Sequence, residues 1–112
     1  MDIHSVLYGF MDRVGDDHRI GPIHISLFLA IVYYYRKQEY QLPIYVYRKE
    51  LMGQAKISAI GTYHKGMREL KRYGYIGYVP SYNPALRSLV YLIWMKPIKI
   101  YVYMIELENC KV

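Results

Sequence analysis

Near the start of the chain, apolar residues recur at alternating intervals of three and one, the pattern of a short amphipathic helix over residues 1–14. Gly15 and the aspartates after it end this helix. A second helix is expected over residues 25–35, after Gly21 and Pro22. Its residues leave no polar face for about three turns, and a helix that is apolar all round is buried on most sides.

Short elements follow in the middle of the chain. Ile44–Val46 comes directly after a proline and predicts a short strand. Residues 48–54 predict a short helix with Leu51 and Met52 pointing inward. Residues 55–57 then connect it to a longer helix.

That longer helix is expected over residues 58–73. Ser58 is predicted to cap it, because a serine hydroxyl can accept a hydrogen bond from a free backbone N–H of the first turn. Gly74 supplies the C-terminal stop. At 100° per residue, four apolar side chains fall within about 80° of one another and predict the buried stripe. They are Ile60, Tyr63, Met67 and Leu70.

The opposite face of this helix follows from the same geometry, with His64 on the flank. It is polar and largely cationic. Its residues are Ser58, Gly61, Thr62, Lys65, Arg68, Glu69 and Arg72.

A β-hairpin is expected after Gly74. Residues 75–79 and 89–94 are both rich in β-branched and aromatic types, and they bracket a polar loop over residues 80–88. Two prolines restrict the backbone of this loop, so it loses less entropy when it binds a partner. Residues 98–105 predict a further strand, which pairs within this chain or with another copy.

Charge is distributed unevenly along the chain. Lys and Arg against Asp and Glu number 2 against 4 in residues 1–35, 12 against 3 in residues 36–99, and 1 against 2 in residues 100–112. The basic middle of the chain fits an anionic partner, although a solvated Lys/Arg-rich surface is the alternative. Fifteen tyrosines against two Phe and one Trp place many rings at the core boundary or at an interface.

Several classes of protein are disfavoured. A chain of 112 residues is one domain, and Cys110, the one cysteine, cannot form an internal disulfide. The histidines have no metal-ligand spacing, no Gly-rich phosphate loop occurs, and no His pair accompanies the tyrosines as a DNA-nicking enzyme requires. No signal sequence or membrane span is visible. We therefore expect a cytoplasmic protein that is not an enzyme and needs no metal or cofactor.

The order of the expected elements is that of an α+β winged helix-turn-helix: a three-helix core with an N-terminal helix, a β-hairpin wing and a C-terminal strand. The single domain divides into an N-terminal helical extension (1–20), the core (21–94) and a tail strand (95–112). An α-helix fits the major groove of DNA, and a flanking hairpin can touch the neighbouring backbone or minor groove.

The residues of this region resemble those of bacterial winged-helix regulators, including MarR-like proteins and plasmid or phage replication initiators. The similar segments are Arg48–Met52, Lys56–Ser58, Thr62–Tyr63, Leu70 and Tyr73–Ile76. A closer resemblance is to small proteins associated with bacterial conjugative elements. It is carried by His24–Leu27, Thr62–Lys65, Gly74–Ile76 and Pro80–Pro84, within residues 20–93.

The resemblance implies a protein that binds duplex DNA and controls transcription, excision or replication of a mobile element. The DNA-binding residues expected from the pattern and the resemblance are Lys56, Ser58, Thr62, Lys65, Arg68 and Arg72 on the helix side and Tyr82, Asn83 and Arg87 on the wing. Arg87 is expected to have few internal partners. Two departures stand out: Tyr47 occupies a position that favours a Ser or Thr cap, and the tail after Trp94 extends past the usual end.

Alternatives remain for the partner. The apolar helix over residues 25–35 is either the central core helix or part of a homodimer interface, and a dimer suits a palindromic DNA site. The abundant tyrosines also fit a protein-interaction module on a winged-helix frame. The sequence does not indicate whether a small-molecule effector binds.

Overall fold

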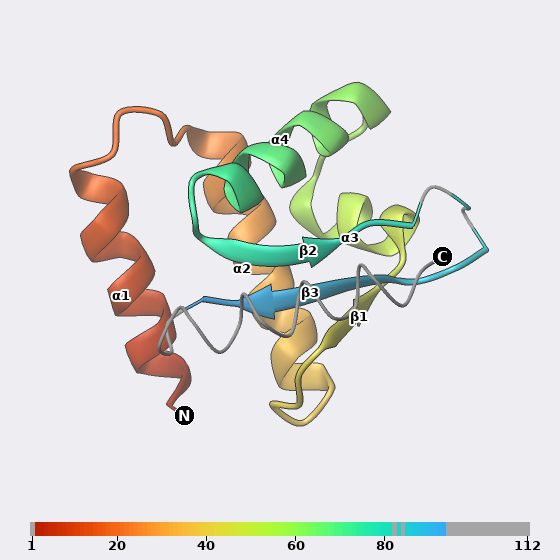
Figure 1. Cartoon of the computed structure of the whole chain (residues 1–112), viewed down its shortest axis with the longest axis horizontal. Coiled ribbons are helices and arrows are strands. Elements are labelled where there is room, and N and C mark those ends of the chain that lie inside the picture. Colours follow the sequence, from red (N-terminus) through yellow and green to blue (C-terminus); the bar gives the residue numbers. More distant parts are fainter. Residues whose placement is uncertain (1, 82, 84, 94–112) are drawn as a thin grey trace.

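A computed structural model describes residues 2–81, 83 and 85–93 of the chain. Over these residues the fold is mixed α+β, with four helices and one three-stranded antiparallel sheet (Figure 1). The helices are α1 (Ile3–Gly15), α2 (Pro22–Lys37), α3 (Arg48–Ala55) and α4 (Ile60–Arg72). All four expected helices are confirmed, with ends that differ by a few residues. The predicted tail strand, Trp94 and Tyr82 lie outside the described residues.

The strands are β1 (Ile44–Val46), β2 (Ile76–Val79) and β3 (Ser88–Leu92). β2 and β3 form the expected antiparallel hairpin, in a register that pairs Ile76 with Leu92. β1 pairs antiparallel with the other edge of β3, with Ile44 opposite Val90, so the strand order is β1-β3-β2. The sheet therefore joins two segments that are about 40 residues apart in the sequence.

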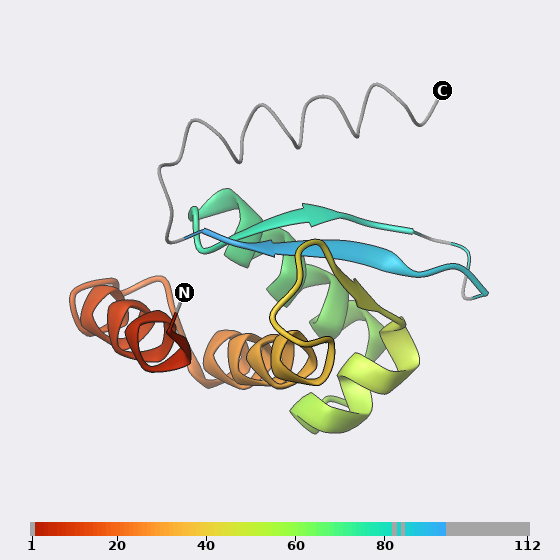
Figure 2. The same cartoon turned by 90° about the horizontal axis from the view of Figure 1, so that it is seen from below.

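The helices pack against one face of the sheet, and the core lies between the two layers (Figure 2). α2 contacts α3, α4 and β1 and is the central element of the core. It is not covered on every side, because the side chains of Leu29 and Tyr33 are 49% and 38% exposed. The largest fully buried side chains include Leu27, Ile31, Ile44, Leu51, Tyr63, Met67, Leu70, Ile76 and Leu92.

α1 belongs to the same core. The ring of Phe10 stacks on Phe28 of α2 with 3.8 Å between the ring centroids, and it meets Tyr75 edge to face at 5.4 Å. Val6 is buried in the same apolar cluster. The N-terminal helix is thus packed into the domain rather than appended to it, at the side of the molecule opposite the tip of the β2–β3 hairpin (Figures 1 and 2).

Polar contacts hold the α1–α2 connection to the turn between α4 and β2. Arg13 donates hydrogen bonds from Nη1 to the carbonyl oxygen of Gly74 (3.0 Å) and from Nη2 to that of Tyr73 (3.3 Å). Asp17 accepts hydrogen bonds from the guanidinium of Arg19 (2.8 Å) and from the hydroxyl of Tyr75 (2.7 Å). We call these six residues the α1–α4 clamp. Gly74 has a φ of 82°, which favours glycine at the predicted helix stop.

Candidate nucleic-acid interface

A tight turn joins α3 to α4. Lys56 ends α3 in the left-handed conformation with a φ of 61°, and the backbone N–H of Ile57 bonds back to the carbonyl oxygen of Met52 (3.0 Å). α3 begins at Arg48, and the side chain of its N-cap residue Tyr47 makes no capping hydrogen bond. This turn sets the direction of α4 relative to α3.

The start of α4 differs from the prediction in two ways. Ala59, not Ser58, is the N-cap residue, and no side-chain hydrogen bond caps the helix. The helix begins two residues later than expected, so the Ser58 hydroxyl lies outside the first turn and is exposed. Ile60 is 48% exposed rather than buried, because as the first residue of α4 it extends past the core that its own stripe covers.

The rest of the buried stripe is confirmed: Tyr63, Met67 and Leu70 are 1% exposed or less. Gly66 is buried beside them, and the sequence analysis missed it. A Cβ added at Gly66 would lie 2.6 Å from Cδ1 of Leu27, so any larger residue here would force the buried Leu27 side chain to shift. An isolated glycine inside a helical pattern was the one signal in the sequence.

Three cations face outward from α4. By the 100° helical spacing Lys65, Arg68 and Arg72 lie within about 60° of one another, on the side opposite the buried stripe. All three are exposed, as predicted. Within the described residues none of the three makes a hydrogen bond or an ion pair. We call this set the α4 cationic face.

The remaining predicted residues of the helix side surround this face. Lys56 is exposed at the turn, and Thr62 is exposed on the flank. Thr62 and Lys65 line a hollow of about 270 Å³ between α4 and the start of α2. The expected polar face is therefore exposed, with Arg68 and Arg72 directed outward and with Thr62 and Lys65 bordering the hollow next to α2.

Glu69, the one carboxylate of α4, bonds to α2 and to the residue that follows α4. Its Oε1 lies 3.0 Å from Nε2 of His24, and its Oε2 accepts a hydrogen bond from the hydroxyl of Tyr73 (3.2 Å). Nδ1 of His24 accepts the backbone N–H of Gly21 (2.9 Å), so the neutral imidazole carries its proton on Nε2 and donates to Glu69. The hydrogen bond from His24, with that from Tyr73, keeps the pKa of Glu69 below its ordinary value.

His24 was not expected to have this role. Its position, three residues after the N-cap Gly21, is where a side chain can bond back to the helix start, and that was the only local signal. Glu69 is 45 residues away in the sequence, so the pair forms only when α2 packs on α4.

The β2–β3 loop contributes two of its predicted residues. Asn83 is exposed, and its Oδ1 accepts the backbone N–H of Ala85 (3.0 Å), which folds the loop back on itself. Ser81 donates its backbone N–H to the hydroxyl of Ser88 (2.9 Å) across the base of the loop. Arg87 is exposed but has an internal partner, contrary to expectation: its guanidinium lies 4.3 Å from the ring centroid of Tyr45.

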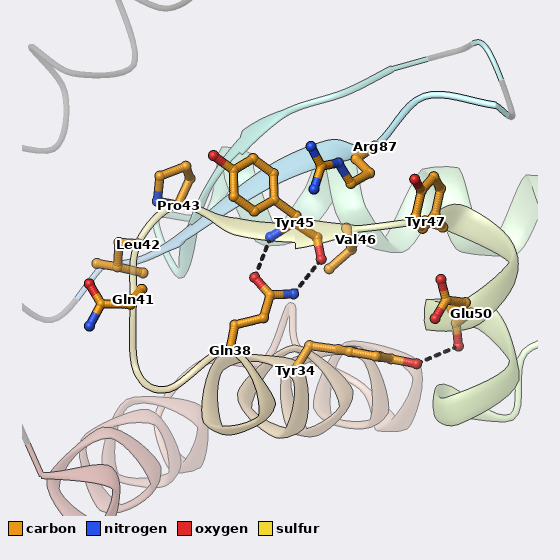
Figure 3. A pocket seen from close by; sticks show the side chains of 10 residues that line it. All are labelled: Tyr34, Gln38, Gln41, Leu42, Pro43, Tyr45, Val46, Tyr47, Glu50 and Arg87. Atoms are coloured by element: carbon orange, nitrogen blue, oxygen red, sulfur yellow. Dashed lines mark hydrogen bonds between the residues drawn. The ribbon is translucent and has the colours of Figure 1, made fainter.

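A groove of about 550 Å³ lies beneath this arginine, between the end of α2, β1 and α3 (Figure 3). Gln38 lies across its floor and closes the free edge of β1, accepting the backbone N–H of Tyr45 (2.9 Å) and donating to its carbonyl oxygen (2.7 Å). The exposed rings of Tyr45 and Tyr47 border the groove with Tyr34. The backbone of β1 at Tyr45 is thus not open to pairing with another strand.

Over residues 2–81, 83 and 85–93 no group of three or more His, Cys, Asp or Glu is placed to hold a metal ion. No helix in this part of the chain is long and apolar enough to cross a membrane. Comparison of the chain with family models, with curated proteins and with solved structures gives no match. The resemblance to winged-helix regulators therefore stays a prediction from the sequence.

Proposed function

We propose that this chain is a non-enzymatic protein that binds duplex DNA with a winged-helix domain. The arrangement of α3, a tight turn, α4 and the β2–β3 hairpin, with β1 paired to β3, supports this proposal. In such a domain the second helix of the pair enters the major groove and the hairpin flanks it. α4 and the hairpin loop correspond to these two elements.

The α4 cationic face is the observation that carries the proposal. Lys65, Arg68 and Arg72 are exposed, lie on one side of a helix and form no ion pair within the described residues. A cationic stripe of this kind can neutralise phosphates along a groove, and neutralising them releases counterions. Glu69 offsets this positive charge only in part, because it is a single carboxylate beside three cations and also accepts hydrogen bonds from His24 and Tyr73.

The other predicted residues would take subsidiary parts. Ser58 and Thr62 lie near the leading end of α4, where side chains reach base edges. Lys56 at the turn and Arg87 beside the hairpin would contact the flanking backbone. We further propose that the protein acts as a homodimer in regulating transcription or a mobile element, with the exposed Leu29 and Tyr33 of α2 covered by the second copy.

Fluorescence anisotropy on a labelled random duplex, between 50 and 200 mM salt, tests DNA binding. Replacing Lys65, Arg68 and Arg72 together by Ala should lower the slope of log K against log salt by about 2.7, since each phosphate contact contributes about 0.9. Arg72→Ala alone should lower it by about one unit.

Arg36→Ala is the matched control, because Arg36 is an exposed arginine near the end of α2, outside the proposed interface. It should leave the slope unchanged. A Kd above about 10⁻⁴ M at low salt would refute the proposal, because even non-specific binders do better. Equal effects of Arg36→Ala and Arg72→Ala would also contradict it.

A second candidate function, a protein-interaction module, is favoured by the groove bordered by Tyr34, Tyr45 and Tyr47. Tyrosine rings supply large contact area and are enriched at protein interfaces. If the chain docks a partner protein there, Tyr47→Ala would abolish that binding and leave the affinity for DNA unchanged. If the Lys65, Arg68 and Arg72 variants instead lose affinity for DNA and Tyr47→Ala does not, the function belongs to α4.

A further inference from the structure

The leading end of α4 is apolar and exposed. Ile60 is the first residue of the helix and is 48% exposed, and Ala59 before it is exposed as well. Gly61 adds no side chain, and the space around it is open within 4 Å of a built Cβ. Because helical side chains tilt toward the N-terminus, Ile60 projects past the end of α4 rather than back onto the core.

The α4 cationic face begins little more than one turn further along the helix, on a different side of it from Ile60. Lys65 follows Ile60 by five residues, and Lys56 precedes it by four at the turn. Both are exposed. A groove that admits the leading end of α4 would therefore meet Ile60 first and these positive charges next, so the fitting partner carries apolar groups within an anionic frame. The major groove of DNA has that chemistry, with thymine methyl groups between two phosphate backbones.

The residue types at this end of α4 narrow the choice of base. Residues 55–68 contain no Asn, Gln, Asp or Glu. Asn and Gln are the residues that pair with adenine through two hydrogen bonds, and Asp and Glu accept from cytosine. Lys65 and Arg68 suit guanine or phosphate. The apolar side chains suit the C5-methyl group of thymine.

We infer that the leading end of α4 reads thymine methyl groups through Ile60, assisted by Ala59. This inference rests on the proposed function and adds the base that is recognised. It assigns sequence preference to contacts with methyl groups, whereas the α4 cationic face supplies affinity without preference. It also gives a role to an isoleucine that the core does not bury.

The test compares two random duplex pools, one made with thymidine and one with deoxyuridine in its place. Uracil lacks only the C5-methyl group, so the hydrogen-bonding edges are unchanged. The wild-type protein should bind the uridine pool more weakly, by about fourfold for each methyl group that is lost from the interface. In Ile60→Ala this ratio should fall toward one, with the salt slope unchanged. Met11→Ala, an equally exposed apolar residue on α1, is the control and should keep the wild-type ratio.

The possible results separate this inference from the proposed function. Equal wild-type affinity for both pools, with a normal salt slope, overturns thymine recognition and leaves DNA binding standing. A uridine effect that persists in Ile60→Ala arises from DNA shape and also overturns the assignment to Ile60. If the protein binds neither pool, both proposals are wrong. The exposed Ile60 would then be tested as a contact with a partner protein.

Discussion

Arg13 and Arg19, in the α1–α4 clamp, have guanidinium groups that are already bonded, to backbone carbonyls in one case and to Asp17 in the other. Each also lies over a tyrosine ring, Arg13 over Tyr75 and Arg19 over Tyr73, about 4 Å from the ring centroid. Arg68 and Arg72 on α4 make no such bond within the described residues. The same residue type thus serves internal structure at one end of α4 and faces outward along the rest of it.

The difference matters because the outward arrangement has an energetic cost. Arg68 and Arg72 are four residues apart on a helix, and like charges at this spacing destabilise it by about 0.2–0.5 kcal/mol. The pair therefore contributes positive charge to the surface of α4, which the proposed contact with DNA phosphates would neutralise.

Reversing both charges should give the largest effect. Arg68→Glu with Arg72→Glu adds repulsion from phosphate to the lost attraction, and we expect DNA affinity to fall at least 100-fold, about 2.7 kcal/mol. Stability should change by about 0.5 kcal/mol or less, because both side chains are exposed. Anisotropy and urea denaturation measure the two quantities. A large loss of stability would show that these arginines have a structural role after all.

Gly66→Val should disturb the seat of α4 on α2. The added side chain would meet Leu27, and overpacking of this kind costs about 1–3 kcal/mol. The midpoint of urea denaturation reports the loss. Gly61→Val is the control, because Gly61 has open space around it. Equal destabilisation by both variants would mean that helix propensity, rather than close packing, is responsible.

Arg13→Ala should show that the clamp affects the stability of the protein and not DNA binding. It removes the donors to Gly74 and Tyr73 and the stacking on Tyr75, at a cost of about 1 kcal/mol or about 4 °C in Tm. The salt slope of DNA binding should stay that of the wild type. If instead the slope falls by one unit with Tm unchanged, Arg13 contacts DNA and the two regions are not distinct.

Lowering the pH should reduce the stability of the protein through Asp17 of the clamp, and this is the smallest of the effects we expect. Hydrogen bonds from Arg19 and Tyr75 hold the pKa of Asp17 well below its ordinary value of 3.8 in the folded protein. The stabilisation is therefore complete above pH 3.8 and is lost as the pH falls toward the folded pKa. Asp17→Asn should lose less stability than the wild type between pH 5 and pH 2, as followed by circular dichroism. Parallel pH profiles would show that the clamp does not depend on this charge.

Much of the fold was predictable because its signals are local. The apolar spacing in α1 and α4, the stop at Gly74 and the two β-prone segments of the hairpin all act within a few residues of one another. The outward direction of Lys65, Arg68 and Arg72 followed from the same periodicity. The errors lie at the start of α4, where the cap at Ser58 and the burial of Ile60 depended on where the helix begins.

The sequence by itself determined which elements form and which side of α4 carries charge, because both depend on the period of the backbone. Only the tertiary structure decided which charges stay free. The contacts of Glu69 with His24, of Arg13 with Gly74 and of Arg87 with Tyr45 join residues 42 to 61 positions apart. Such pairs have no local signature, since they exist only after α2, α4 and the sheet have packed.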